Sequence, residues 1–203
     1  MAFAAFFTEV PSVCVHDGLA QLLGASSDGI IKYHYADAVR LAGHSCPTVA
    51  GAWLMARTGL RALYGNALPE RGNITVALPA AEDEGVTGVI GQVLTLVTGA
   101  AAANGFHGLG GAHCRAGLLH YEQREVTGVQ LRRNDTGAGV EVLYNPGSVP
   151  WSDGMRPLMM AVLEGHADAG QTQRFGELWQ ERVRRILIEH NDDPSVIQAH
   201  LMG

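Results

Sequence analysis

The sequence has few cysteines, a single lysine and little charge of either sign, and each shortage excludes a class of protein. Cys14, Cys46 and Cys114 are too few and too widely spaced for a disulfide framework, and no Cys-x-x-Cys pair exists that would form a structural zinc knuckle. The only lysine, Lys32, lies in no Schiff-base or phosphate-loop motif. A formal net charge of −6 provides no overall field that would attract nucleic acid.

Long apolar runs are also missing. Residues 1–13 are apolar, but they contain no basic region and reach Glu9 and Pro11 early, so we expect neither a membrane span nor a signal peptide. Residues 86–103 are interrupted by Gly and Thr and are expected to form a buried core helix. These features predict a cytoplasmic protein with reduced cysteines and no membrane contact.

The hydrophobic patterning predicts an α+β fold, a mostly antiparallel sheet packed by helices. Hydrophobic residues make up 47% of the chain and charged residues 17%, which excludes disorder over most of its length. We expect a core domain over residues 1–150 and a helical extension over 151–203, packed on the core or on a dimer partner. The expected helices span 17–24, 35–42, 47–66, 86–103, 155–165 and 172–190, with a last turn over 193–202, and the expected strands span 71–78, 118–123, 128–133 and 139–144.

The sharpest local feature is the segment Gly43-His44-Ser45-Cys46-Pro47. Proline is favoured at the first helical position, so the segment predicts a helix that begins at Pro47 with Cys46 as its N-cap. Free backbone N–H groups and the helix dipole at such a position lower a thiol pKa from about 8.5 to roughly 3.5–7.5. A thiolate beside the imidazole of His44 suits zinc or another transition metal, or a nucleophile with its base. Alternatively, Cys46 is a small buried apolar residue and His44 a hydrogen-bonded loop residue.

This segment lies within a longer stretch, residues 35–76, that closely resembles the N-terminal core of the FmdE family, named for one of the components of formylmethanofuran dehydrogenase. The family hallmark is Gly-His-x-Cys-Pro opening a long helix; the resemblance covers residues 16–145 and is most specific at 37–54. It implies an α+β domain that forms an intertwined homodimer, with a metal, often zinc, near His44 and Cys46. It also maps the family's shared acid onto Asp37, which would orient the imidazole or accept a proton if its helix runs unbroken to His44.

The sequence departs from this family in two places. Many members have Gly-Cys-Thr-x-Gly-Lys after the long helix, whereas this chain has Gly99-Ala100 followed by a glycine-rich segment, so the second cysteine is missing there. No cysteine follows Cys114, so the cysteine-rich zinc-binding tail of some members is also missing. The dehydrogenase chemistry itself is expected to need molybdenum or tungsten subunits, so the resemblance does not imply that activity.

The glycine-rich segment, residues 105–117, is the second candidate site. The backbone at Gly108, Gly110 and Gly111, with the side chain of Arg115, is expected to bind an anionic group of a cofactor or substrate. The segment is neither a Walker A loop nor a GxGxxG fingerprint, so it does not predict nucleotide binding. Three further side chains are candidate ligands that would complete a metal shell begun by His44 and Cys46: His16, His107 and Cys114. The alternative is a glycine-rich turn with solvated histidines.

Three functions follow from these residues. The first is a metal-dependent enzyme or metal-binding domain on a homodimeric core, with Cys46 and Asp37 as catalytic residues and an unidentified small-molecule substrate or cofactor. The second is a binding module for haem or another planar cofactor, in a cleft lined by the glycine-rich segment and Trp53. The third is a metal-free thiol enzyme that uses Cys46 as nucleophile and His44 as base.

Overall fold

The computed structural model describes residues 3–203 and has an α+β architecture, as predicted. The helices are α1 (Gly18–Leu22), α2 (Tyr35–Ala42), α3 (Pro47–Tyr64), α4 (Thr87–Thr98), α5 (Met155–Leu163) and α6 (Ala169–Arg184), with short turns η1 (Ala5–Thr8), η2 (Pro146–Ser148) and the π-helical η3 (Arg185–Glu189). The strands are β1 (Val13–His16), β2 (Ile30–Tyr33), β3 (Ile74–Ala77), β4 (Leu119–His120), β5 (Val129–Arg133), β6 (Gly139–Tyr144) and β7 (Ile197–Met202).

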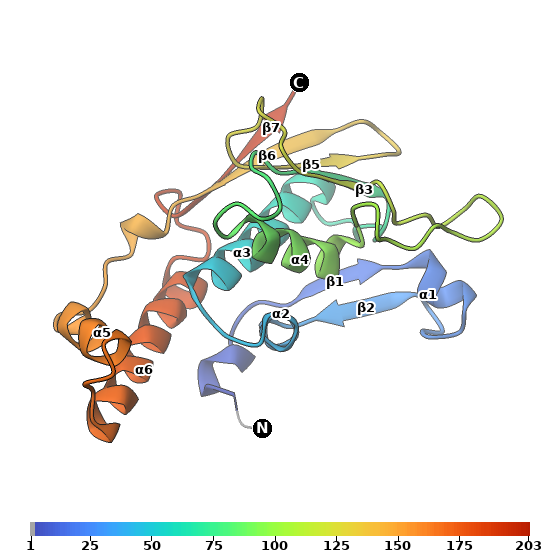
Figure 1. Ribbon diagram of the computed structural model, residues 1–203. Coiled ribbons are helices and arrows are strands. Elements are labelled where there is room, and N and C mark those ends of the chain that lie inside the picture. The colour runs from blue at the N-terminus through green and yellow to red at the C-terminus, as the bar shows by residue number, and fades with distance from the viewer. Residues whose placement is uncertain (1–2) are drawn as a thin grey trace.

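A five-stranded sheet, in the order β4-β3-β5-β6-β7, forms one layer of the molecule. Only the β3–β4 pair is parallel, which confirms the mostly antiparallel sheet. Helices α3 and α4 lie beneath this sheet, and the two-stranded β1–β2 ribbon with α2 lies on their other side (Figure 1). The β5–β6 hairpin turns at residues 134–138, where the sequence contains Asp135-Thr136-Gly137.

Helix α3 occupies the centre of the fold and is covered on nearly every side. Trp53 and Leu54 are both fully buried although they lie on different faces of the helix, because the sheet, α4 and α2 pack around it. Two glycines allow the sheet to approach the helix. A Cβ atom at Gly59 would lie 2.8 Å from Cδ1 of Leu131, and one at Gly51 would collide with the ring of Tyr144.

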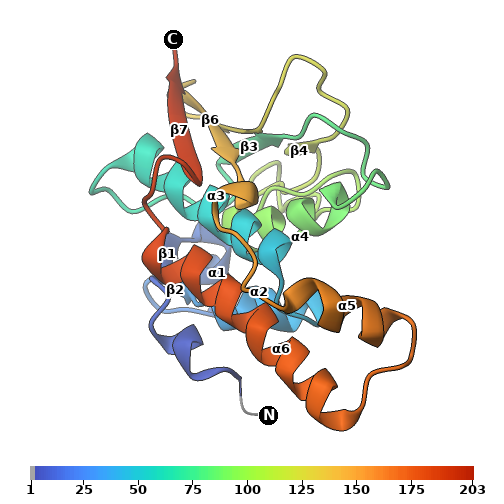
Figure 2. The ribbon, with the colours of Figure 1, turned by 90° about the vertical axis from the view of Figure 1, so that its left-hand side faces the viewer.

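The segment after η2 contains a strand that was not predicted. Helices α5 and α6 form the predicted pair and project away from the sheet (Figure 2), but residues 193–202 do not form a further helical turn. They contain β7, which adds to the edge of the sheet beside β6 from Ile197 to Met202. The prediction was wrong because a short run of mixed residues has no decisive periodicity, and the free edge of β6 offers it backbone hydrogen bonds.

Two other predictions need correction. The helix predicted over residues 86–103 ends at Thr98, because Gly99 takes a left-handed conformation with φ of 75° and its N–H bonds to Thr95. Cys14, which its valine neighbours would place in the core, lies on the exposed side of β1, between the buried Val13 and Val15. Within residues 3–203, no helix combines the length and apolar character that crossing a bilayer requires.

The packing of α3 against Tyr144 makes a stability prediction. Gly51→Ala should lower the free energy of unfolding by about 1–3 kcal/mol, because the new methyl group overpacks the contact with the Tyr144 ring. Gly176→Ala, in α6, is the matched control: nothing lies within 4 Å of its Cβ position, so it should raise stability by about 0.5–1 kcal/mol. Urea denaturation measures both, and equal effects of the two substitutions would contradict the packing described.

Candidate functional site

The start of α3 has the geometry predicted from the sequence. Helix α2 ends at Gly43, in the left-handed region with φ of 76°, and α3 begins at Pro47 with Cys46 as its N-cap. The Cys46 sulfur accepts a hydrogen bond from the backbone N–H of Val49 at 3.4 Å. The thiol therefore sits at the positive end of an 18-residue helix, while the residue as a whole is buried in the apolar core.

The imidazole of His44 is exposed, and its tautomer is set by a neighbouring carbonyl. Nδ1 lies 2.9 Å from the backbone oxygen of Ala42. Because a carbonyl oxygen only accepts hydrogen bonds, Nδ1 carries the proton of the neutral ring. Nε2 then keeps its lone pair, which is the arrangement that metal-bound histidines adopt when a backbone carbonyl orients them.

Three other elements hold the turn between α2 and α3 in place. The Tyr35 hydroxyl lies 2.9 Å from Oγ of Ser45, and the Ser45 carbonyl accepts hydrogen bonds from Trp179 and Gln180 of α6, at 3.0 and 3.1 Å. The Tyr144 hydroxyl donates to the Pro47 carbonyl at 2.8 Å. Burial raises the pKa of both tyrosines well above the usual value, so both hydroxyls stay protonated and serve as structural hydrogen-bonding groups.

Asp37 has partners other than His44. Its carboxylate accepts the backbone N–H of His34 at 2.8 Å in a capping box and pairs with Arg40 at 2.6 Å. The predicted role of Asp37 toward His44 depended on a helix that continues to His44, but α2 ends at Ala42. In this structure Asp37 caps the start of α2. Its role toward His44 remains a prediction.

The predicted ligands do not assemble into one site within a single chain. In residues 3–203, no three His, Cys, Asp or Glu side chains are placed to hold a metal ion together. His107 and Cys114 are exposed on the glycine-rich segment, and the Cys114 thiol contacts the Ala116 carbonyl at 3.5 Å. His16 pairs instead with Glu70, at 2.5 Å between Nδ1 and Oε2.

The glycines of the second candidate site form a tight hairpin. Leu109 and Ala112 exchange both backbone hydrogen bonds at 2.9 Å, with Gly110 and Gly111 between them at φ of 55° and 83°. Gly108, with φ of 92°, closely approaches the Ala112 carbonyl. Their positive φ angles are thus explained by the turn itself, and binding of a cofactor by these glycines remains a prediction.

Arg115 belongs to a buried ion-pair network that the sequence did not reveal. The Asp17 carboxylate, 3% exposed, lies between two guanidinium groups, 2.8 Å from Arg71 and 2.7 Å from Arg115. Arg71 also donates to the carbonyls of Thr95 and Leu96 at the end of α4. One carboxylate therefore joins three segments that are far apart in the sequence.

Charge and hydrogen bonding shift the pKa values of this network in opposite directions. Burial raises the pKa of Asp17, but hydrogen bonds from Arg71 and the Ala20 amide, with the charges of Arg115 and Arg71, outweigh it and hold the pKa below its usual value. Next to it, the hydrogen bond to Glu70 raises the pKa of His16 more than desolvation lowers it. Asp17 is also the N-cap of α1, where its side chain accepts hydrogen bonds from the backbone N–H groups of Leu19 and Ala20.

No family model matches this sequence, and no curated protein sequence matches it. The fold is similar to that of a tungsten formylmethanofuran dehydrogenase FmdE-like protein from Syntrophus aciditrophicus, with 13% identity and a TM-score of 0.44 over 84% of this chain and 72% of that chain. Values this low do not establish membership of a family.

The shared carboxylate of Asp17 predicts a large effect of removing its charge. Asp17→Asn keeps a competent N-cap but removes the carboxylate shared by the buried Arg115 and the partly buried Arg71, so the free energy of unfolding should fall by about 3–5 kcal/mol. Asp83→Asn, on the exposed turn before α4, should change it by less than about 0.5 kcal/mol. Denaturant titration at pH 7 compares them, and a loss of less than about 1 kcal/mol for Asp17→Asn would contradict the role assigned to this carboxylate.

The His16–Glu70 pair predicts a titration shift. The pKa of His16 in the folded protein should exceed the usual value of about 6.5, and Glu70→Gln should lower it. Since the folded pKa is the raised one, the stabilisation is complete below the unfolded pKa and is lost as the pH rises through the folded value. NMR titration of the imidazole measures this shift. Glu125→Gln is the exposed control, and an unchanged His16 titration in Glu70→Gln would show that the pair is not formed in solution.

Proposed function

We propose that this protein binds a divalent transition metal, zinc in the first instance, through His44 and Cys46, in a site that two copies of the chain complete. The observation that carries the proposal is the contact between Nδ1 of His44 and the Ala42 carbonyl. It leaves an exposed imidazole with a free Nε2 lone pair two residues from a thiol at a helix N-terminus.

The donor atoms of His44 and Cys46, an imidazole nitrogen and a sulfur, are of the types that such a metal binds. Zinc binds imidazole nitrogen and thiolate sulfur, and His44 and Cys46 carry these two donor types at the start of α3. The Val49 N–H already bonds the sulfur, as it would bond a thiolate ligand. Bound here with an open coordination position, zinc would supply Lewis acidity and an activated water.

One chain supplies fewer donors than a zinc ion needs, and this favours a homodimer. Zinc sites keep at least three protein ligands, whereas His44 and Cys46 provide two and residues 3–203 contain no larger cluster. Trp179 and Gln180, which hold the turn, belong to α6, and its neighbour α5 carries the exposed apolar side chains of Met160 and Leu163. A second copy that covers these side chains would pack on the helix pair that holds the turn.

The haem hypothesis is less well supported by the side chains. Trp53, which would line a haem cleft, is fully buried in the core, so that part of the haem hypothesis was wrong. The 8% exposure of Cys46 limits access to the thiol for a substrate and for a metal alike, so chelation separates the metal-free thiol enzyme from the metal proposal: the activity of a thiol enzyme would survive it. A colourless, zinc-containing preparation would separate the metal proposal from the haem hypothesis.

Metal analysis of protein prepared without a histidine tag tests the proposal. We expect stoichiometric zinc in the wild type, at least one per dimer, and loss of most of it in His44→Ala and in Cys46→Ser, since each removes one donor from each chain. His200→Ala, in the exposed strand β7, is the matched control and should keep its zinc. Circular dichroism confirms that each variant is folded. Zinc retained by the folded double variant His44→Ala, Cys46→Ser would refute the proposed ligands.

The dimer part of the proposal is tested separately by light scattering with size-exclusion chromatography. We expect the zinc to elute with a dimer, and chelation to remove the metal and weaken the dimer together. A monomer that holds stoichiometric zinc would contradict the claim that two copies complete the site.

A further inference from the structure

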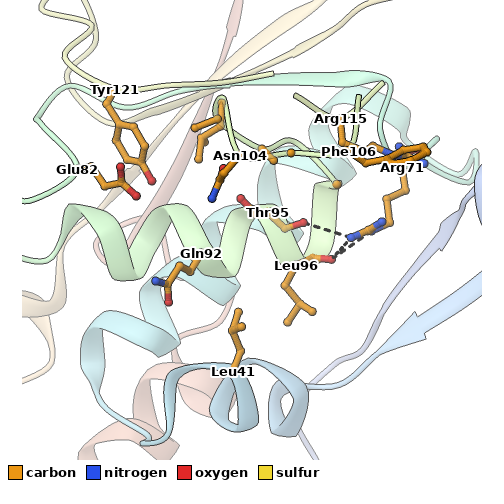
Figure 3. Close-up of a pocket in the computed structure, with 15 residues that line it drawn as sticks. Leu41, Arg71, Glu82, Gln92, Thr95, Leu96, Asn104, Phe106, Arg115 and Tyr121 are labelled. Atoms are coloured by element: carbon orange, nitrogen blue, oxygen red, sulfur yellow. Dashed lines mark hydrogen bonds between the residues drawn. The ribbon is translucent and has the colours of Figure 1, made fainter. Parts of the chain in front are cut away.

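A cavity of about 430 Å³ lies along one face of α4, in the size range of pockets for small molecules. Gln92, Thr95, Leu96 and Gly99 form its α4 wall, since these positions recur on one face of a helix. Arg71, Arg115 and Phe106 gather at one end of the cavity, and Glu82 and Tyr121 at the other (Figure 3). None of residues 43–47 lines it.

Two guanidinium groups meet at the arginine end of the cavity. Arg71 and Arg115 share the single carboxylate of Asp17, while the neighbouring Glu70 is hydrogen-bonded to His16. Each arginine therefore has only a share of one carboxylate as its ion-pair partner, and the cavity is the open side from which an anion would pair with them.

Arg115 also has a hydrogen-bond donor without an acceptor. Its Nη2 donates to Asp17 and its Nη1 to the Arg71 carbonyl, but its Nε is buried and has no partner. The side chain is 7% exposed and lines the cavity. A buried N–H of a charged group that lacks an acceptor is uncommon, and a carboxylate is the acceptor that suits a guanidinium best.

The other residues that line the cavity restrict the chemical class of the ligand. Leu41, Leu96 and Phe106 line the cavity with apolar surface. This surface favours a ligand with a hydrocarbon portion, which inorganic phosphate lacks. At the far end, Glu82 would repel a second negative charge. The cavity therefore matches a molecule with one carboxylate and an uncharged or donor-bearing far end.

We propose that this cavity binds a small organic monocarboxylate, with its carboxylate at Arg115 and its body along α4 toward Glu82. Nothing in this site depends on the metal proposed at His44 and Cys46, so the two proposals fail separately.

Isothermal titration calorimetry of the full chain with four probes tests the ligand class. Hexanoate should bind saturably at millimolar or lower concentration. Adipate, which adds a second carboxylate, should bind about fivefold more weakly, because its far charge meets Glu82. Hexylamine and inorganic phosphate should not bind measurably. No saturable binding of hexanoate, or tighter binding of phosphate than of hexanoate, would overturn the proposal.

Substitution of an exposed wall residue locates the binding without disturbing the buried network. Leu41 is 46% exposed on α2, so Leu41→Trp should fold and should weaken hexanoate binding at least tenfold by filling the cavity. Leu22→Trp, at an exposed position in α1 away from the cavity, should bind hexanoate like the wild type. Unchanged binding by folded Leu41→Trp would place the ligand elsewhere and overturn the assignment.

The orientation of the ligand is tested by a change of specificity. Glu82→Gln should remove the preference for hexanoate over adipate, a change of about fivefold in the ratio of affinities. Glu84→Gln, two residues away on the same exposed turn and outside the cavity, should leave the ratio unchanged. If Glu82→Gln leaves the ratio unchanged as well, the ligand does not extend toward Glu82 and the proposed orientation is wrong.

Discussion

The burial of α3 on almost all sides is the constraint on which the rest of the structure depends. The sheet packs on one side of this helix and α2 and α4 on the others, so its axis is held from several directions. Pro47 and the Cys46 cap fix the first turn, and hydrogen bonds to Ser45 from Tyr35 and from α6 hold the residue before it. The thiol and imidazole are thus presented by a rigid turn.

The parts of the fold that could be predicted are those with strong local signals. Pro47 and Gly43 marked a helix start and a helix end, and the hairpin of β5 and β6 follows from its alternation and its turn. Strand β7 could not be predicted, because its formation depends on the free edge of β6 rather than on its own residues. Helix α4 ends at Thr98, earlier than predicted, because Gly99 after it adopts a left-handed conformation.

The candidate sites were predictable in their residues but not in their contacts. Cys46 was correctly placed at an N-cap, whereas nothing in the sequence indicated that His16 would pair with Glu70. Asp17 and Arg115 are 98 residues apart, and only the tertiary fold brings the carboxylate between two guanidinium groups. Long-range ion pairs of this kind leave no periodic signal in a single sequence, so the positively charged cavity wall became visible only in the structure.

The most direct test of zinc ligation by His44 and Cys46 is X-ray absorption spectroscopy at the zinc edge. The geometry at the start of α3 predicts at least one sulfur at about 2.3 Å and one imidazole nitrogen at about 2.0 Å from the metal. In Cys46→Ser the sulfur shell should disappear. A first shell of nitrogen and oxygen alone in the wild-type protein would contradict ligation by Cys46.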